Sequence, residues 1–192
     1  MTRKFKSLGL VLAAVFAMSA IGASAASAAE FHSAGAPTTI TGTQSTSHVF
    51  TTSAGTVTCK TATFSGTQST QTATTVQLTP TYKECTAFGF INVPIDVNGC
   101  SYTFTSHGAT TVDCAAGKAF EITVPGCTTK VGPQTFAKGM EYTTVGSTPS
   151  RSITSHTNVT EIEYNECGTV RKNGTYKGDT SIKGSAGEVW FA

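Results

Sequence analysis

Apolar and polar residues alternate along most of the chain with a period of two, which is typical of half-buried β-strands. In Ile91–Val97 every odd-numbered position is Ile or Val. The next two residues, Asn98-Gly99, favour a type I′ hairpin turn, because both turn positions need positive φ. Cys100–Thr105 then alternates again, and a two-residue turn would place the apolar residues of both runs on one face. We therefore predict a hairpin whose apolar face packs on a core.

The chain after this hairpin continues the alternation as far as residue 124. If Ser106–Gly108 is a three-residue loop, Tyr102 lies opposite Val112. In the same register Cys100 lies opposite Cys114, where a cross-strand disulfide is geometrically plausible. Residues 91–124 are therefore expected to form an antiparallel meander.

Strands of the same kind are expected on both sides of this meander. Pro94 cannot donate a ladder hydrogen bond, so the sheet beside it should have an edge or a bulge. Outside the N-terminal segment no stretch has the 3.6-residue period of an amphipathic helix. The expected strands are 38–44, 48–52, 56–64, 72–82, 91–97, 100–105, 120–124, 135–137, 140–145, 153–165, 175–183 and 188–191.

This pattern predicts an all-β fold of about ten to thirteen short strands stapled by disulfides. An antiparallel β-sandwich is the simplest arrangement. A closed antiparallel β-barrel is the alternative, because counting strands does not separate the two. Residues 30–192 are numerous enough for one domain with a real core, and a single domain is expected there.

Residues 1–29 have the pattern of a secretory signal peptide. Arg3, Lys4 and Lys6 precede the apolar run Leu8–Ile21, and small residues follow it. The prediction is therefore a secreted, extracellular protein. No later stretch is long and apolar enough to cross a membrane as a helix, so no integral membrane segment is expected after signal removal.

The low charge of the chain argues against a nucleic-acid partner. Charged residues make up 12% of the sequence, about half the usual share. The net charge of +2 becomes −1 when the three basic residues of the signal segment are removed. A chain with no basic field and no basic-aromatic motif has no means to attract nucleic acid. Its frequent Thr residues suit outer strand faces, because the methyl packs on a pleated surface while the hydroxyl is hydrated.

All six cysteines follow the signal segment, and an even number in a secreted chain indicates disulfides. The register argument favours Cys100–Cys114. The other four are expected to pair in sequence order, as Cys59–Cys85 and Cys127–Cys167. A structural metal would require close pairs such as Cys-x-x-Cys, which the sequence lacks, so no metal site is predicted.

The sharpest cluster of candidate catalytic residues is Glu161-Ile162-Glu163-Tyr164-Asn165-Glu166. On a strand Glu161 and Glu163 share a face, and a bulge near Asn165 would bring Glu166 to it. Glycoside hydrolysis requires paired carboxylates at this reach. The string resembles the Glu-x-Asp-x-x-Glu strand motif of laminarinase-type β-jelly-roll glycosidases, with Glu163 in place of Asp. That resemblance implies Glu161 as nucleophile and Glu166 as acid/base. Calcium binding, or simple solvation of glutamates on an outer strand face, are the other interpretations.

No other motif in the chain points to chemistry. The histidines His32, His48, His107 and His156 are scattered without a partner pattern. The sequence has no Gly-x-Ser-x-Gly, no His-Glu-x-x-His and no phosphate-cradling Gly loop. No cofactor is therefore expected.

One resemblance extends over five segments: Glu30–His32, Val49–Thr52, Gly55–Cys59, Val97–Phe104 and Asn173–Trp190. Together they resemble a group of uncharacterised secreted, cysteine-containing all-β proteins of high-GC Gram-positive bacteria, with no known activity. The resemblance implies export and an all-β disulfide fold, and it implies no catalytic residue.

These observations favour a non-catalytic extracellular or cell-envelope protein with a structural or adhesive role, because low charge and Thr-rich strands suit assembly through sheet faces and edges. Its partner would be a cell-envelope polysaccharide or protein. The first alternative is a polysaccharide-binding module, and the second is a glycoside hydrolase built on Glu161 and Glu166. The module predicts a row of exposed aromatic side chains, for which the candidates are Phe88, Phe90, Tyr142, Tyr164 and Tyr176.

Overall fold

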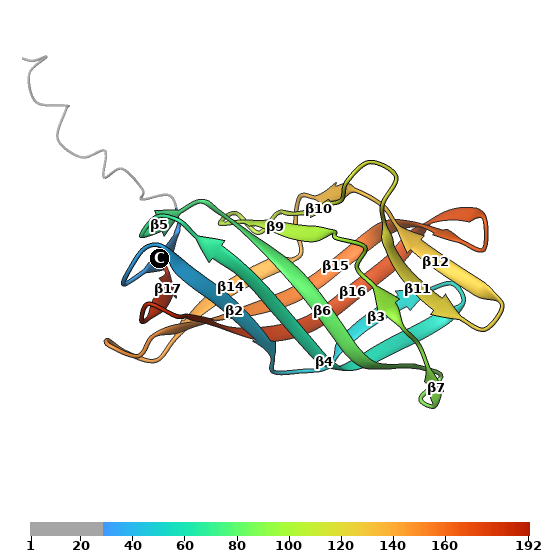
Figure 1. Ribbon diagram of the computed structural model, residues 1–192, viewed down its shortest axis with the longest axis horizontal. Coiled ribbons are helices and arrows are strands. Elements are labelled where there is room, and N and C mark those ends of the chain that lie inside the picture. The colour runs from blue at the N-terminus through green and yellow to red at the C-terminus, as the bar shows by residue number, and fades with distance from the viewer. Residues whose placement is uncertain (1–28) are drawn as a thin grey trace, which may run out of the picture.

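A computed structural model describes residues 29–192, so the expected signal peptide lies outside the described residues except for its last position. The described part contains 17 β-strands and no helix (Figure 1). It therefore contains no helix that could cross a membrane. The first strands are β1 (Phe31–Ser33), β2 (Thr38–Gln44), β3 (His48–Thr52), β4 (Gly55–Gln68), β5 (Thr72–Ala73), β6 (Thr75–Ala87), β7 (Ile91–Asn92), β8 (Ile95–Asp96) and β9 (Ser101–Thr105). The others are β10 (Thr110–Asp113), β11 (Phe120–Val124), β12 (Cys127–Val131), β13 (Gln134–Phe136), β14 (Met140–Val145), β15 (Ser152–Glu166), β16 (Thr169–Gly184) and β17 (Val189–Phe191).

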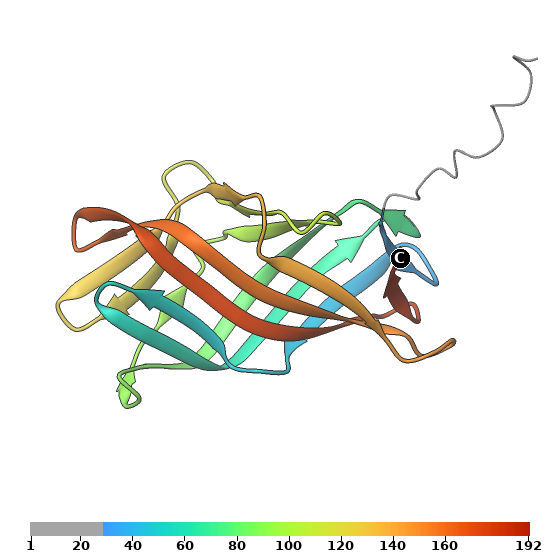
Figure 2. The ribbon, with the colours of Figure 1, turned by 180° about the vertical axis from the view of Figure 1, so that it is seen from behind.

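Fourteen of these strands form one antiparallel sheet, ordered β13-β10-β9-β6-β4-β2-β16-β15-β12-β11-β8 along its main path. Strands β3, β7 and β14 pair beside this path. The long pairs β4–β6 and β15–β16 lie in opposite layers, which Figures 1 and 2 show from the two sides. The two ends of the path, β13 and β8, are not paired with each other. The fold is thus the all-β, sandwich-like arrangement expected from the sequence, and it is not a closed barrel.

A small sheet, β17-β1-β5, lies at one end of the sandwich beside the C-terminus (Figure 1). Phe31 pairs with Phe191 across β1 and β17, and it pairs with Ala73 across β1 and β5. The side chains of Phe31 and Val189 are buried in the main core. The small sheet therefore covers one end of the interior.

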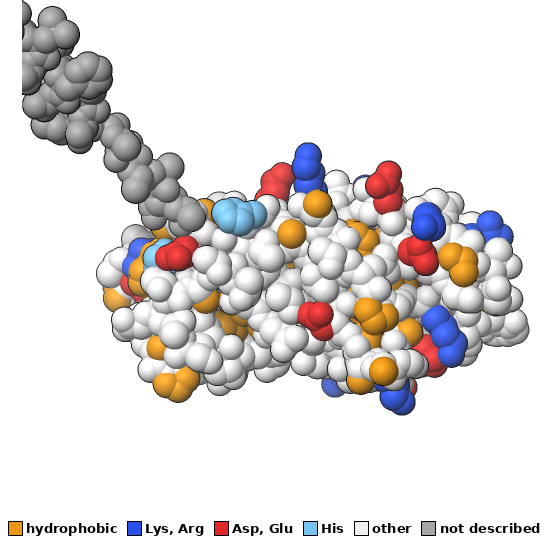
Figure 3. All heavy atoms as spheres, turned by 90° about the horizontal axis from the view of Figure 1, so that it is seen from above, with side chains coloured by type: hydrophobic (Ala, Val, Ile, Leu, Met, Phe, Trp, Pro, Cys, Tyr) orange, Lys and Arg blue, Asp and Glu red, His pale blue; other side chains and the backbone are white. Residues whose placement is uncertain are grey.

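The alternation of the sequence explains the two faces of each strand. In β6 the side chains of Val76, Leu78 and Tyr82 are buried, whereas the intervening Thr79 and Thr81 are exposed. Burial of one face provides the hydrophobic free energy of the fold, and hydroxyls keep the other face hydrated. Figure 3 shows the result, a surface that is mostly uncharged with scattered acidic and basic side chains.

The structure contains three disulfides, and they are the three expected pairs: Cys59–Cys85, Cys100–Cys114 and Cys127–Cys167. Cys59 and Cys85 lie directly opposite each other on β4 and β6. The register that favoured the second pair is also confirmed, because Tyr102 lies opposite Val112 on β9 and β10. The disulfides agree with an oxidising environment.

The hairpin predicted across Asn98-Gly99 is wrong, although the turn itself forms. Both turn residues have positive φ, and the Cys100 N–H donates to the Val97 carbonyl at 2.7 Å. The flanking strands then separate, since β8 pairs with β11 and β9 pairs with β6 and β10.

Pro94 accounts for part of this separation. It has no N–H group and divides the expected strand 91–97 into β7 and β8. Strand β7 stays beside β6, whereas β8 crosses to β11, where Ile95 lies opposite Ile122. The prediction of an edge or bulge beside Pro94 is therefore correct, and the expected continuous strand through it is not formed.

Candidate functional site

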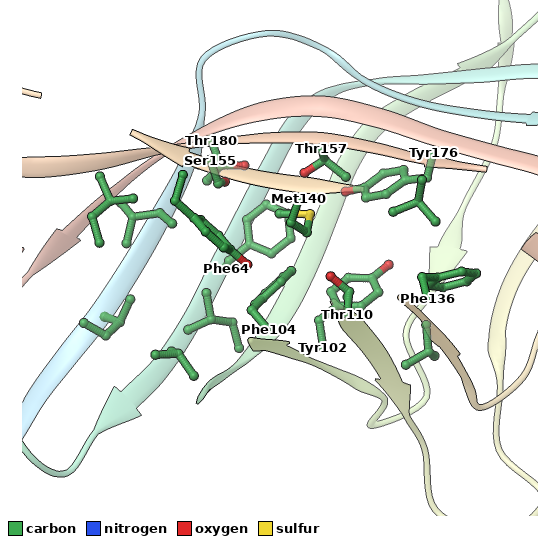
Figure 4. A pocket seen from close by; sticks show the side chains of 18 of the residues that line it. Phe64, Tyr102, Phe104, Thr110, Phe136, Met140, Ser155, Thr157, Tyr176 and Thr180 are labelled. Atoms are coloured by element: carbon green, nitrogen blue, oxygen red, sulfur yellow. The ribbon is translucent and has the colours of Figure 1, made fainter. Parts of the chain in front are cut away.

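The interior of the sandwich contains an apolar cavity of about 80 Å³ (Figure 4). Side chains from both layers and from the small sheet line it. Among them are Phe64 on β4, Tyr102 and Phe104 on β9, Phe136 on β13 and Tyr176 on β16. The lining is almost entirely hydrocarbon, so a molecule held there would be recognised mainly by apolar contact.

An unfilled cavity of this size is unfavourable. Cavities in protein cores cost about 24 cal/mol per Å³, which corresponds to about 2 kcal/mol here. Most protein interiors are packed without voids larger than a water molecule. The lining offers water few hydrogen-bond partners, which favours an apolar ligand over water.

One side of the interior is closed by a chain of buried hydrogen bonds. His48 on β3 bonds through Nδ1 to the Tyr176 hydroxyl (2.6 Å), and through Nε2 to the Thr180 hydroxyl (3.2 Å). The Tyr82 hydroxyl bonds to those of Tyr176 (2.8 Å) and Tyr102 (3.2 Å). This hydroxyl network therefore links β3, β6 and β9 to β16 through satisfied polar groups.

Burial changes the proton affinity of every ionisable group in this network. Desolvation lowers the pKa of His48 to about 4, against the opposing effect of Asp179, so its imidazole is neutral at physiological pH. Burial raises the pKa of Tyr102 to about 12 and holds the pKa values of Tyr82 and Tyr176 well above the usual range. All four groups are uncharged, as a buried structural network requires.

Two fully buried hydroxyl oxygens at the cavity wall, Thr110 Oγ1 on β10 and the Tyr142 hydroxyl on β14, have no partner within the described residues. Ser155 and Thr157 on β15 also line the cavity. Thr110 is 4% exposed, and Figure 4 shows it at the cavity wall. A buried hydroxyl without a hydrogen bond costs about 1–3 kcal/mol. Each of the two unpaired oxygens has less than 1 Å² of accessible surface, so a molecule in the cavity reaches them only if the surrounding side chains move.

A second concavity, a groove of about 610 Å³, lies on the outer surface beside β13. Its walls come from 132–138, from Thr160, Glu161 and Glu163 of β15, and from Lys172 of β16. The Gln134 side chain crosses it, donating to the Glu163 carbonyl at 2.8 Å and accepting from the Glu163 N–H at 2.9 Å. Lys172 Nζ lies 2.9 Å from a Glu163 carboxylate oxygen.

The structure separates the three glutamates proposed as catalytic. Glu161 and Glu163 are exposed in the groove, whereas Glu166 is 7% exposed and shares the buried alternation of Ile162 and Tyr164. The expected bulge near Asn165 is absent, because pairing with β16 is regular from Tyr164 to Glu166. The irregularities lie between Val159 and Tyr164. Glu166 is therefore not turned toward the other two.

Glu166 instead has a structural environment at the base of a turn. Its carboxylate accepts from the Ser53 hydroxyl (2.7 Å) and the Ala54 N–H (3.2 Å), and Arg171 Nε lies 3.2 Å away. Burial alone would raise its pKa, but these hydrogen bonds and the arginine charge outweigh burial and lower it. A general acid requires a raised pKa, so the environment of Glu166 favours an ion-paired structural carboxylate.

The aromatic residues proposed for polysaccharide binding do not form an exposed row. Phe88 and Phe90 are 62% and 79% exposed at the β6–β7 turn. Tyr164 and Tyr176 are 2% and 7% exposed, and Tyr142 packs edge-on against Phe31 at a ring distance of 4.9 Å. Among residues 29–192 there is also no group of three or more His, Cys, Asp or Glu residues arranged to hold a metal ion.

Sequence reasoning missed the interior cavity and its unpaired hydroxyls. Thr110 and Tyr142 belong to ordinary alternating strands, and only the three-dimensional packing shows that their hydroxyls lack partners. Comparison of the chain with protein-family models, with curated proteins and with solved structures gives no match. The resemblance to a group of Gram-positive bacterial proteins therefore stays a prediction.

Proposed function

We propose that this is an exported, non-catalytic protein that binds a small, mainly apolar molecule with one hydrogen-bonding group inside its folded sheet. The observation that carries the proposal is the apolar cavity whose wall contains the unpaired Thr110 hydroxyl. Apolar contact would supply most of the affinity, and the hydroxyl would orient the molecule and discriminate among ligands.

Three disulfides and the signal-like N-terminal sequence support export. The structural or adhesive role suggested by composition is compatible with this function and stays a prediction. The buried Glu166 and the mainly buried tyrosines give neither the glycosidase nor the polysaccharide-binding alternative a specific supporting observation.

The test compares two ligands that differ by one hydroxyl and are close to the cavity in volume, phenol and benzene, by calorimetric titration of the oxidised protein. We expect both to bind, with phenol favoured by about fivefold, because one net hydrogen bond contributes about 1 kcal/mol. Thr110→Val should remove that preference.

Thr111→Val is the matched control. Thr111 is the next residue on β10, and its hydroxyl bonds Thr135 outside the cavity at 3.0 Å. This variant should keep the preference. Failure of both ligands to bind at millimolar concentration would show that the proposed function is wrong.

A further inference from the structure

The disulfide between Cys127 and Cys167 is the most accessible of the three. Cys167 is an exposed residue in the turn between β15 and β16, and Cys127 is half-buried at the start of β12. In each of the other two disulfides one partner is completely buried, because Cys59 and Cys100 have no exposed surface. Thiol–disulfide exchange requires a thiolate to reach a sulfur atom, so a dissolved thiol meets the Cys127–Cys167 disulfide first.

The turn that carries Cys167 would be formed as well or better without a cysteine. Cys167 and Gly168 make a two-residue turn in which both residues have positive φ, 51° and 91°. Turns of this kind favour Asn or Asp before Gly, because these residues tolerate positive φ. Turn geometry therefore does not account for the cysteine, which places its sulfur at the end of the hairpin.

This disulfide fastens one end of the large sheet. Strands β8, β11 and β12 are the last three on the main path of the sheet, and we call these residues the flap (Ile95–Asp96, Phe120–Val124 and Cys127–Val131). Strands β11 and β12 lie at the end of the molecule opposite the small sheet (Figure 1). Among the described residues the only ladder that joins the flap to the rest of the sheet is β12–β15, which has two residue pairs. The Cys167 N–H adds one bond to the Thr128 carbonyl at 3.3 Å.

The other two disulfides join strands that are paired over a greater length. Cys59 and Cys85 lie within a β4–β6 ladder of nine residue pairs. Cys100 and Cys114 extend the β9–β10 ladder, which has four pairs. Breaking either bond leaves a ladder that still holds its two strands together. The accessible disulfide is therefore also the one that supports the shortest ladder of the three.

The flap covers part of the hydrophobic core. Phe120 and Ile122 of β11 are each 5% exposed, and Phe120 stacks on Tyr102 of β9 at a ring distance of 5.2 Å. Ile95 of β8 and Val131 of β12 pack against the same core. Burial of these side chains opposes separation of the flap. Loss of the disulfide should therefore make the flap open more often without unfolding the chain.

We propose that the Cys127–Cys167 disulfide is a reversible redox clasp, which a dithiol reductant opens selectively and which holds the flap against β15. The first thiolate of the dithiol attacks Cys167 Sγ. The S–S bond breaks, and its electron pair leaves with Cys127 Sγ, which takes a proton from water. The second thiolate attacks the mixed disulfide and releases the Cys167 thiolate, which is also protonated. The disulfide thus gains two electrons and two protons, and the dithiol is oxidised to a disulfide. The clasp does not depend on a ligand in the cavity.

Selective opening is tested by adding dithiothreitol to the full oxidised protein, alkylating free thiols at intervals and locating the labels by peptide mass spectrometry. Cys127 and Cys167 should be labelled together, at least about tenfold faster than the other four cysteines, because they are accessible in the folded state. In guanidinium chloride, where the fold is absent, the three disulfides should react within about threefold of one another. Labelling of another pair first, or of all six cysteines together, would overturn the clasp. A tenfold preference that persists in denaturant would do the same.

Movement of the flap is tested by hydrogen exchange after selective reduction and alkylation of this disulfide. Amides of β11 and β12 should exchange at least about tenfold faster, whereas those of β4 and β6 should not change, because only the flap loses its covalent tie. The variant Cys127→Ser with Cys167→Ser should give the same pattern without the alkyl groups. The matched control, Cys59→Ala with Cys85→Ala, should not accelerate the flap selectively. Unchanged protection of the flap, or uniform acceleration over the whole sheet, would overturn the clasp.

Reversibility is tested by removing the reductant and adding glutathione disulfide to the reduced protein. Slow exchange in β11 and β12 should return, because the closed flap holds the Cα atoms of Cys127 and Cys167 5.2 Å apart, within the usual range for a disulfide. The variant with both residues replaced by Ser should not recover. Failure of the natural chain to regain both the disulfide and the protection would show that the opening is damage and not a switch.

Discussion

The interior contains two sets of buried hydroxyls that differ in one respect. In the network of His48, Tyr82, Tyr102 and Tyr176 every hydroxyl has a hydrogen-bond partner. In the second set, Thr110 and Tyr142, the hydroxyls have none among the described residues. Both sets lie in the same apolar surroundings. A satisfied group stabilises the fold, whereas an unsatisfied one reduces stability until a ligand supplies its partner.

His48 is buried but is not the candidate site, because its hydrogen bonds are satisfied within the protein. His48 is fully buried and has a strongly lowered pKa, which often marks functional residues. Its ring nitrogens, however, both have partners, and Gly178 leaves just enough room for the ring. A Cβ at Gly178 would lie 2.6 Å from His48 Nδ1. The packing thus fixes His48 as part of the structure.

The largest expected effect is a pH dependence of the free energy of unfolding that comes from His48. The unfolded histidine has a pKa near 6.5, and the folded one has a pKa of about 4. Between these values the unfolded chain binds more protons, so stability is complete above pH 6.5 and is lost as pH falls toward 4. The free energy of unfolding should decrease by about 3 kcal/mol from pH 7.5 to 4, and by about 2 kcal/mol already at pH 5.

Denaturant titration at several pH values measures this loss. The lowered pKa values of Glu166 and Glu188 affect stability only below their unfolded value of 4.5, so data above pH 5 isolate the histidine. His107→Gln, at an exposed position, should leave the slope unchanged. An NMR titration that places the His48 pKa near 6.5 would contradict the expectation.

A smaller change in the free energy of unfolding should distinguish a hydrogen-bonded tyrosine hydroxyl, Tyr176, from one without a partner, Tyr142. Tyr176→Phe removes the partner of His48 and Tyr82, and should lower the free energy of unfolding by about 2 kcal/mol. Tyr142→Phe removes a hydroxyl without a partner and should change it by less than about 0.5 kcal/mol, or increase it. Chemical denaturation of both variants at pH 7.5 measures the difference. Equal losses would mean that the Tyr142 hydroxyl is bonded in solution.

The smallest expected change in the free energy of unfolding should have opposite signs when Thr110 and Thr180 are each replaced by Val. Thr110→Val replaces an unpaired hydroxyl by a methyl and should stabilise the ligand-free protein by about 1 kcal/mol. Thr180→Val removes the hydroxyl bonded to His48 and should destabilise it by about 1 kcal/mol. The shift of the thermal midpoint gives both signs. A loss of stability in Thr110→Val would show that this hydroxyl already has a partner.

Much of the sheet could be predicted from the sequence because alternation is a local signal. Four expected strands, 38–44, 48–52, 120–124 and 140–145, have the bounds of β2, β3, β11 and β14. The others lie within longer strands, are divided, or differ from the observed strand by one residue at their ends. Local turn chemistry could not determine the partner of each strand. Asn98-Gly99 forms its turn, but burial of Tyr102 and Phe104 beside Leu78 and Val76 of β6 outweighs pairing with β8.

The site could not be predicted, for a physical reason. Glu161, Glu163 and Glu166 were predicted as a site because their spacing along one strand resembles the paired carboxylates that glycoside hydrolysis requires. Thr110 is one of many threonines, and its significance depends on a missing hydrogen bond, which is a property of packing. The one available signal was the alternation itself, which puts Thr110 on the same face as Val112. In an alternating strand, a polar residue on the apolar face predicts a buried polar group that needs a hydrogen-bond partner.

The placement of the disulfides has a consequence for the time course of folding. Each joins neighbouring strands that are close in sequence, with separations of 14, 26 and 40 residues. The contacts that complete the sandwich, β2 with β16 and β1 with β17, join opposite ends of the chain. Such distant pairings form slowly because long loops must close first. We therefore expect oxidation to fix three local segments early. Pairing of the two ends of the chain would then be the slow step, and the protein would be most prone to aggregation before it.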